Sequence, residues 1–244
     1  MKTDKSTVKA CVFDTFGTLL DWRGSVSRQV AEFAKAKGIQ GDWKDFTDRW
    51  RNYYLTVTVE IGMGKKQYIP IDSIHGIALD ELSKDFGLQL SEEERVEMLG
   101  FWRRLEPWPD VVKGLGLLKK KFIIASLSNS DFGMLTEMSK YAGLPWDAIL
   151  AAELVHTYKP NPTTYLLGPT MLGFEPHEVM MCAAHVQDLD AARNAGLRTA
   201  FIVRPNEYGE VDGGKNKYHT ADLNKGDHEI GVASVIDLAR QLGV

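Results

Sequence analysis

The sequence predicts an α/β fold in which a Rossmann-like parallel sheet core carries an inserted helical cap domain. After residue 107, apolar runs of strand length alternate with helical stretches, which is typical of a parallel sheet with right-handed crossovers. The apolar run at residues 8–13 belongs with that sheet, whereas the stretch that follows it has helical periodicity and no convincing strand. We therefore expect an α/β core at residues 1–19 and 107–244 and a cap at residues 20–106.

The cap sequence predicts four helices. The first ends near Gly38, and the second covers about residues 42–61. Asp72 is the expected N-cap of the third helix, which ends at Gly87, and Ser91 opens the fourth with a capping box. Apolar residues at helical spacing predict the buried faces of the last two helices. They are Ile74, Ile77, Ala78, Leu82 and Phe86, then Val96, Leu99, Phe101 and Trp102.

The core sequence predicts three further strands with helices between them. Gly143 and Gly173 end two of these helices, and Asn161-Pro162 starts the second of the two with proline at the first helical position. Residues 208–227 are rich in Gly, Lys, Asp and Asn, which predicts an exposed loop. The expected elements are a helix at 115–118, a strand at 122–127, helices ending at 143 and 173, a strand at 179–184, a helix at 190–195, a strand at 199–203 and a helix at 233–242.

Composition argues against several classes of partner. The chain has 244 residues, and its 29 basic and 33 acidic side chains leave a net charge of −4, so no global positive field is available to hold nucleic acid. No apolar stretch approaches membrane-spanning length, and the charged N-terminus at residues 1–5 does not resemble a signal peptide. Cys11 and Cys182 lie in apolar runs and are expected to be small buried hydrophobes. We expect a cytoplasmic protein with no nucleic-acid or membrane partner.

Polar side chains gather at one edge of the predicted sheet. Carboxyl ends of parallel strands form the crevice in which open α/β sheets bind ligands, so side chains that follow these ends should converge. The first strand ends directly on Asp14, and a glycine turn follows at Gly17. The full set is Asp14 and Thr18 after the first strand, Ser128 and Asn129 after the second, Lys159 before the Asn161 helix, and His185 and Asp188 after the third.

Five pieces of sequence resemble the haloacid dehalogenase superfamily and, within it, the (S)-2-haloacid dehalogenase branch. Each piece is a weak signal by itself, but together, in order and at the expected distances, they are specific. The similarity covers nearly the whole chain, including the cap. The pieces are Phe13-Asp14-Thr15-Phe16-Gly17-Thr18-Leu19, Trp50-Arg51, Leu127-Ser128-Asn129, Tyr158-Lys159-Pro160 followed by Tyr165, and the Asp188 segment.

The resemblance implies hydrolysis of a carbon–halogen bond. Asp14 would attack the carbon that bears the halogen and form an aspartyl ester, which water would then cleave at the Asp14 carbonyl. A single displacement inverts the carbon, so an L-2-haloacid would give a D-2-hydroxyacid, and haloacetates are further expected substrates. Halide leaves without protonation, so no metal and no organic cofactor are expected. The implied partners are a small 2-haloacid, water and a second copy of the chain in a homodimer.

The same resemblance assigns roles around the nucleophile. Thr18 would hydrogen-bond Asp14. Ser128 and Lys159 would hold the substrate carboxylate and orient Asp14. Asp188 would pair with Lys159 and help to position the water.

Four more residues complete the implied pocket. Arg51 would receive the leaving halide from the cap side, with help from Asn129. Phe16 would form an apolar wall beside the alkyl group of the substrate. Tyr165 would line the pocket, with an ordinary buried helix tyrosine as the alternative.

Phe16 also separates this interpretation from phosphate chemistry. A phosphatase of the superfamily carries Asp at this position as general acid and base and generally needs Mg²⁺, whereas a phenyl ring moves no proton and binds no metal. A phosphatase and a phosphonate hydrolase remain as alternatives. The second would need a cap lysine that forms an imine, for which Lys65 and Lys66 are the candidates. A non-catalytic relative that binds a carboxylate is the third alternative.

Three positions near the third strand depart from the better-known members. Ala183 and His185 stand where those members carry Ser and Asn, and Gln187 stands where Trp is frequent. All three are expected on the water and ester side of the pocket. His185 has an ordinary pKa near 6.5, which leaves three roles open: general base of ester hydrolysis, halide-binding imidazolium, or neutral spacer. Residues 204–209 form either the pocket rim or a dimer contact.

The histidine also bears on the leaving group. Fluoride is a poor leaving group and needs strong hydrogen-bond donation. A His185 imidazole beside Arg51 can supply it. Fluoroacetate is therefore a hypothetical substrate beside chloro- and bromo-acids.

Overall fold

Strand β1 is an inner strand of a five-stranded sheet in the computed structural model, which describes residues 7–209 and 228–244. Val12 of β1 pairs with Ala125 of β4 on one side and Met181 of β5 on the other. The order is β4-β1-β5-β6-β7, and every pairing is parallel, which confirms the Rossmann-like α/β fold class. The strands are β1 Ala10–Phe13, β4 Ile123–Ser126, β5 Val179–Ala183, β6 Arg198–Ile202 and β7 Ile230–Val232.

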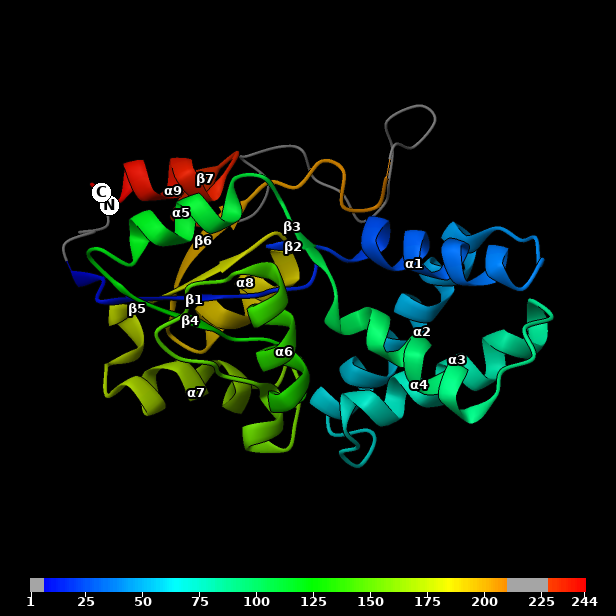
Figure 1. Cartoon of the computed structure of the whole chain (residues 1–244). Coiled ribbons are helices and arrows are strands. Elements are labelled where there is room, and N and C mark those ends of the chain that lie inside the picture. The colour runs from blue at the N-terminus through cyan, green and yellow to red at the C-terminus, as the bar shows by residue number, and fades with distance from the viewer. Residues whose placement is uncertain (1–6, 210–227) are drawn as a thin grey trace.

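Helices cover both faces of this sheet (Figure 1). Side chains alternate along β1, so Cys11 and Phe13 join the core cluster that contains α5, α6 and α9, whereas Ala10 and Val12 join the cluster that contains α7 and α8. Burial on both faces explains why the strand is continuously apolar. The helices are α5 Val111–Leu118, α6 Phe132–Ala142, α7 Pro162–Leu172, α8 Val186–Asn194 and α9 Val235–Gln241, with 3₁₀ turns η3 Ala152–Val155 and η4 Pro176–Glu178.

Two short features of the fold escaped the sequence prediction. Strand β7 is one of them, because its three residues, Ile230–Val232, are too few to show a period. The other is a two-residue antiparallel ribbon, in which β2 Leu20–Asp21 pairs with β3 Glu106–Pro107. The expectation that residues 20–105 hold no strand is therefore wrong at Leu20–Asp21, whereas β3 lies just beyond that stretch. The ribbon pairs the segment that leaves the sheet region with the segment that returns to it.

Helices α1 to α4 and the turn η2 form a helical block beyond the carboxyl end of β1 (Figure 1). Trp22, Trp50 and Trp102 are buried in its interior, where the ring of Trp102 stacks on Trp22 and meets Trp50 edge-on. Large aromatic side chains therefore supply much of the area that this block buries. The elements are α1 Trp22–Ala36, α2 Trp43–Gly62, α3 Ile71–Asp85, α4 Glu92–Leu99 and η2 Gly100–Arg103.

Local signals for the helix ends are largely confirmed. The capping box of Ser91 is present, and Gly143 and Gly173 end α6 and α7 in the left-handed conformation that glycine adopts without strain. The expected N-cap role of Asp72 is wrong, because α3 begins one residue earlier, after Pro70. The predicted buried positions Ile77 and Val96 are also wrong, since their side chains are exposed.

A carboxylate from the sheet side takes the place of the expected cap on α3. Asp131 accepts hydrogen bonds from the backbone N–H groups of Ile71 and Asp72, both at 2.8 Å. Two tyrosines make similar links, since Tyr54 Oη donates to the carbonyl of Asn129 and Tyr158 Oη donates to the carbonyl of Ile69, each at 2.7 Å. These bonds hold the helical block against the loops that follow β4 and precede α7.

Two sequence predictions fall on residues outside the described ranges. They concern the charged N-terminus at residues 1–5 and residues 210–227 of the expected loop. At the start of that loop, Tyr208 and Gly209 are half-buried and not exposed. No helix within the described residues is both long enough and apolar enough to cross a bilayer.

Candidate active site

Asp14 lies at the carboxyl end of β1, as the sequence predicted, and only 8% of it is exposed. Its backbone N–H donates to the carbonyl of Cys182, the last point at which β1 and β5 run together. The turn that follows needs glycine at position 17, where φ is +84°. A Cβ there would also lie 1.9 Å from Oε1 of Glu207, so this turn and Glu207 approach each other closely.

Lys159 occupies the Oδ1 side of Asp14. Its Nζ lies 3.3 Å from Asp14 Oδ1 and 2.7 Å from Asp188 Oδ2. Asp188 accepts a second hydrogen bond on its other oxygen, from Tyr165 Oη at 2.7 Å. The structure therefore brings together four of the predicted residues in one buried chain of charged and polar groups. We call Lys159, Asp188 and Tyr165 the lysine arm.

A different set of groups occupies the Oδ2 side of Asp14. Thr18 Oγ1 donates to Oδ2 at 2.8 Å, and the backbone N–H of Ala184 donates to that same hydroxyl at 2.9 Å. Because the Thr18 oxygen accepts from Ala184, its proton is free to point at Asp14. His185 Nδ1 lies 3.5 Å from the same carboxylate oxygen.

Glu207 completes the Oδ2 side, and the sequence did not single it out. Both of its carboxylate oxygens lie 2.9 Å from His185 Nε2, and Trp22 Nε1 donates to Oε1 at 3.1 Å. The side chain is 2% exposed. The sequence leaves two roles for residues 204–209, pocket rim or dimer contact, and the structure places the glutamate of this segment in the site. We call Thr18, His185, Glu207 and Trp22 the histidine arm.

The charges around Asp14 control its protonation. Burial by itself raises the pKa of Asp14, but the Lys159 ammonium and the His185 imidazole together hold that pKa well below its ordinary value. Burial lowers the pKa of Lys159, yet the carboxylates of Asp188 and Asp14 outweigh it and raise that pKa. Asp14 is therefore a carboxylate beside an ammonium at neutral pH.

His185 is charged for the same reason. Burial would lower its pKa, but Glu207 and Asp14 raise it from the usual 6.5 to about 10. The imidazole then carries a proton on each nitrogen, one facing each carboxylate.

Arg51 reaches the site from α2 and is 5% exposed. Its guanidinium carbon lies 5.2 Å from the ring centroid of Phe16, 5.3 Å from that of Trp22 and 4.5 Å from that of Tyr54. Among the described residues, its Nε and Nη1 have no hydrogen-bond partner. A buried cation with idle donors, set among aromatic faces, is suited to bind an anion.

Phe16 forms part of the wall beneath this cation. It is 1% exposed, and its ring packs against Tyr54 and Trp102. The position two residues after Asp14 thus presents an apolar face and no acid.

Ser128 and Asn129 lie where predicted but are already engaged by neighbouring groups. Ser128 Oγ is 2.6 Å from Thr15 Oγ1, and Asn129 Oδ1 accepts from the backbone N–H of Lys159 at 2.8 Å. Asn129 therefore orients the loop that carries Lys159. Ser128 joins the turn after Asp14 to the end of β4.

Of the three positions that depart from the better-known relatives, only His185 contacts the polar site. Ala183 is fully buried and belongs to the cluster of α7 and α8, and Gln187 is exposed on α8. The expectation that all three face the water side of the pocket is wrong for Gln187. A helix that starts at Val186 turns that side chain outward.

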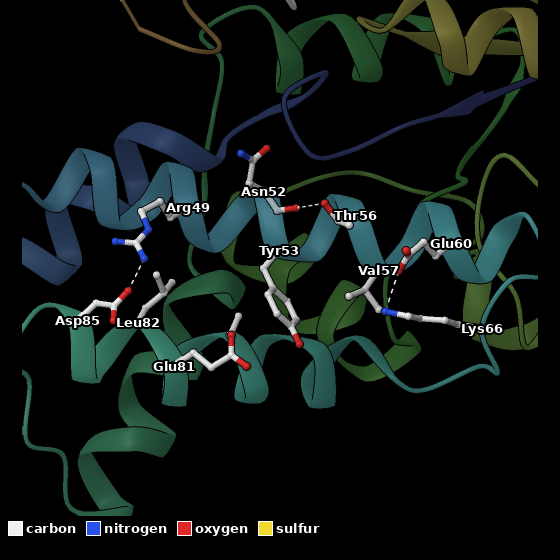
Figure 2. Close-up of a pocket in the computed structure, with 11 residues that line it drawn as sticks. Arg49, Asn52, Tyr53, Thr56, Val57, Glu60, Lys66, Glu81, Leu82 and Asp85 are labelled. Carbon is white, nitrogen blue, oxygen red and sulfur yellow. Dashed lines mark hydrogen bonds and ion pairs between the residues drawn. The ribbon is translucent and has the colours of Figure 1, made fainter.

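A separate groove of about 810 Å³ lies between α2 and α3 (Figure 2). Lys66 lines it and pairs with Glu60 at 2.7 Å, while Lys65 is exposed. None of the predicted active-site residues lines this groove. Lys66 is thus paired away from the site around Asp14. Within the part of the chain that the structure describes, no group of three or more His, Cys, Asp or Glu side chains is placed to hold a metal ion.

The fold and this site together define a Rossmann-like α/β protein with a buried, ion-paired aspartate at the carboxyl edge of its sheet. The haloacid dehalogenase-like hydrolase family matches residues 8–196. (S)-2-haloacid dehalogenase 4A of Burkholderia cepacia is 30% identical over 83% of this chain and 87% of its own. The chain therefore belongs to the haloacid dehalogenase-like hydrolases and, within them, to the (S)-2-haloacid dehalogenase branch.

Solved structures agree with this assignment. The L-2-haloacid dehalogenase PA0810 is 40% identical, with a TM-score of 0.88 over 96% of this chain and 98% of its own. The defluorinating L-2-haloacid dehalogenase Rha0230 is 36% identical, with a TM-score of 0.91 over the full length of both chains.

Proposed function

We propose that this protein hydrolyses short 2-haloalkanoic acids, including haloacetates and L-2-haloacids, to 2-hydroxy acids. The observation that carries the proposal is the setting of Asp14: a buried carboxylate kept anionic by Lys159 and His185, with Phe16 where a phosphatase needs an acid. An anionic carboxylate with no proton donor two residues away is equipped to attack carbon. A site without that proton donor is poorly equipped to protonate a leaving oxygen.

The chemistry begins with a displacement at carbon. An oxygen of Asp14 forms a bond to C2 of the substrate while the carbon–halogen bond breaks and halide departs with the electron pair. The relative from Xanthobacter autotrophicus, 26% identical with a TM-score of 0.79, has been solved with chloropropionic acid covalently bound. That relative supports the proposed aspartyl ester in this chain.

Arg51 is the proposed anion receptor. Its Nε and Nη1 have no partner among the described residues, and its guanidinium carbon lies 5.2 Å from the ring centroid of Phe16. Halide that leaves the substrate carbon would therefore meet a cation within an apolar wall. Lys159 stays next to Asp14 and keeps it ionised. Ser128 and Asn129 shape the loops that hold these groups.

We propose that residues 20–106 act as a cap domain on a core of residues 1–19 and 107–244. The helical block supplies Arg51, Tyr54 and Trp22, and hydrogen bonds such as Tyr54 to Asn129 anchor it to the sheet side. A site enclosed between two such units excludes water during the displacement, which strengthens the electrostatic interactions around Asp14.

The alternatives receive less support. Phe16 removes the acid that a phosphatase uses. Of the two cap lysines that are candidates in a phosphonate hydrolase, Lys66 is paired with Glu60 in the outer groove and Lys65 is exposed. A carboxylate-binding protein without activity would need no ionised nucleophile, yet Asp14 is held ionised.

Halide release is the direct test. Purified protein is assayed with fluoro-, chloro- and bromoacetate and with both enantiomers of 2-chloropropionate, and the L-enantiomer is expected to react with inversion. A single turnover in ¹⁸O-water should place the heavy oxygen in Asp14 before it reaches product. Absence of halide release from every substrate would contradict the proposal, and label found first in product would contradict the ester.

Fluoroacetate is a further proposed substrate. The structural relative Rha0230 is described as defluorinating, and this chain matches it over its whole length. Among the described residues, Arg51 Nε and Nη1 have no hydrogen-bond partner, so this buried guanidinium can donate to departing fluoride. A fluoride electrode that records no release while chloroacetate turns over would contradict this extension.

The homodimer and the cytoplasmic location also remain predictions. Sedimentation velocity checks the homodimer.

A further inference from the structure

Two hydrogen-bond donors converge on one oxygen of the proposed nucleophile. Thr18 Oγ1 lies 2.8 Å and His185 Nδ1 lies 3.5 Å from Asp14 Oδ2, whereas Lys159 is on Oδ1. The hydroxyl of Thr18 is aimed by the Ala184 N–H, and the imidazole is aimed by Glu207. Each donor is therefore oriented by a second group on the side away from Asp14. Such preorganised pairs of donors stabilise oxygen atoms on which negative charge develops.

We infer that His185 and Thr18 form an oxyanion hole for hydrolysis of the Asp14 ester, and that Glu207 is the positioning residue that keeps His185 charged and correctly turned. This inference rests on the proposed function, since it concerns the second half of the same reaction. It assigns Glu207, which lies between Trp22 and His185, a role in clearing the ester.

The step balances in atoms and charge. Asp14 Oδ1 carries the substrate carbon, and Oδ2 is the ester carbonyl oxygen. Water attacks Cγ while the carboxylate of Asp188 takes its proton, and the carbonyl electron pair moves to Oδ2. Collapse of this intermediate breaks the Cγ–Oδ1 bond, and the departing alkoxide takes the proton back from Asp188. Asp14 then returns to its anionic form with release of one proton to solvent.

The geometry opposes the other roles for His185. Nε2 faces two carboxylate oxygens at 2.9 Å, and Nδ1 faces a third oxygen, so both nitrogens act as donors and no lone pair is left to accept a proton from water. A neutral spacer would leave one nitrogen lone pair against a carboxylate. The charged groups placed next to the ring are Asp14, which follows β1, and Glu207, which follows β6.

The ester state makes Glu207 decisive. When Asp14 is alkylated it loses its negative charge, so Glu207 becomes the one carboxylate among the described residues that holds the proton on His185. A glutamate with both oxygens on Nε2 and an indole donor on Oε1 cannot turn away easily. His185 therefore keeps its Nδ1 proton at the stage when the oxyanion forms.

The test compares Glu207→Gln with the wild type under rapid mixing with chloroacetate. The variant should release about one equivalent of chloride per active site at close to the wild-type rate. Turnover should then slow by roughly 10- to 100-fold, because weaker oxyanion stabilisation affects only ester hydrolysis. Mass spectrometry of the quenched protein should find the glycolyl ester on Asp14. Glu207→Asp should recover part of the loss, and Glu32→Gln on the exposed side of α1 is the matched control for loss of one charge.

A pH profile separates positioning from general damage to the fold. The imidazolium form is the active one, so hydrolysis falls as pH rises through the pKa of His185. That pKa is raised to about 10 in the resting enzyme, and it must drop when Glu207 becomes a neutral amide. The alkaline fall in the rate of ester hydrolysis should therefore move to lower pH in Glu207→Gln. We expect a shift of at least about one pH unit. A merely structural residue would leave the profile in place.

The outcomes also distinguish the two proposals. If the wild type releases no halide, the proposed function fails. If the wild type releases halide but Glu207→Gln neither accumulates ester nor shifts the pH profile, the role of Glu207 fails while the proposed function stands.

Discussion

The lysine arm and the histidine arm around Asp14 differ in how many of their residues the sequence predicted. The lysine arm consists of Lys159, Asp188 and Tyr165, all of which the resemblance named in advance, and the structure joins them in one chain. The histidine arm holds Thr18 and His185, but its buried carboxylate, Glu207, comes from a loop whose position the sequence left open.

The two oxygens of the Asp14 carboxylate thus have different surroundings, each suited to a different step. On Oδ1 an ammonium keeps the nucleophile ionised, which serves the first displacement. On Oδ2 two donors are aligned as they would be for an oxyanion, which serves the second step. Variants of the two arms should therefore slow different steps, and this difference is measurable.

Asp14→Asn removes the group that both arms serve and should have the largest effect. Halide release should fall by at least about 10⁴-fold, because an amide is no nucleophile at carbon. Asp45→Asn, an exposed position on α2, is the matched control and should release halide at the wild-type rate. Residual turnover within tenfold of the wild type would place the nucleophile elsewhere.

Lys159→Met breaks the lysine arm and should slow the first step. It removes the ammonium that lies between the Asp14 and Asp188 carboxylates, so we expect about a 10²- to 10³-fold loss in the chloride burst. The pKa of Asp14 should rise. Since the anion is the active form, activity should then be lost at a higher pH on the acid side of the rate profile than in the wild type. Lys113→Met, an exposed lysine on α5, is the control; an unchanged burst would contradict the assignment.

Thr18→Val breaks the histidine arm from its other end. Valine keeps the shape of the buried threonine but removes the donor to Asp14 Oδ2, so ester hydrolysis should slow by about 10²-fold. The ester should accumulate while the chloride burst persists. Thr18→Ser retains the hydroxyl and should hydrolyse the ester much faster than the valine variant. Equal losses in both steps would mean that the two arms do not divide the reaction.

Tyr165→Phe is the mildest change and affects the far end of the lysine arm. It removes only the hydrogen bond from the phenol to Asp188 Oδ1. One such bond corresponds to about a three- to tenfold loss in rate. The steady-state rates of chloride release by the wild type and the variant measure this loss. A loss above 10²-fold would show that Tyr165 contacts the substrate itself.

Much of the fold follows from local patterns. Alternation of apolar runs and helices predicted the parallel sheet, and Ser91, Gly143 and Gly173 marked helix ends by rules that act within a few residues. Errors arose where local rules compete with packing. Ile77 continues an apolar period yet is exposed, because the buried stripe of α3 runs through Ile74, Ala78 and Leu82 and position 77 lies beside it.

The active site divides in the same way. Residues that follow strand ends were predictable because parallel strands bring their carboxyl ends to one edge, and this holds for Asp14, Thr18 and His185. Arg51 required the resemblance, since an arginine in the middle of a helix carries no signal of burial. Only the structure shows that Arg51 Nε and Nη1 are buried among aromatic rings without a hydrogen-bond partner in the described residues.

The sequence alone determined the order of the elements, the placement of the nucleophile at the end of a buried strand and the absence of an acid two residues later, because these depend on neighbours along the chain. Only the tertiary structure decided that Glu207 faces His185 across 22 residues and that Asp131 caps α3 across 60. Such contacts are made between side chains on separate loops. No local periodicity records which loop a charged side chain will meet, since that depends on how the whole sheet and the helical block pack.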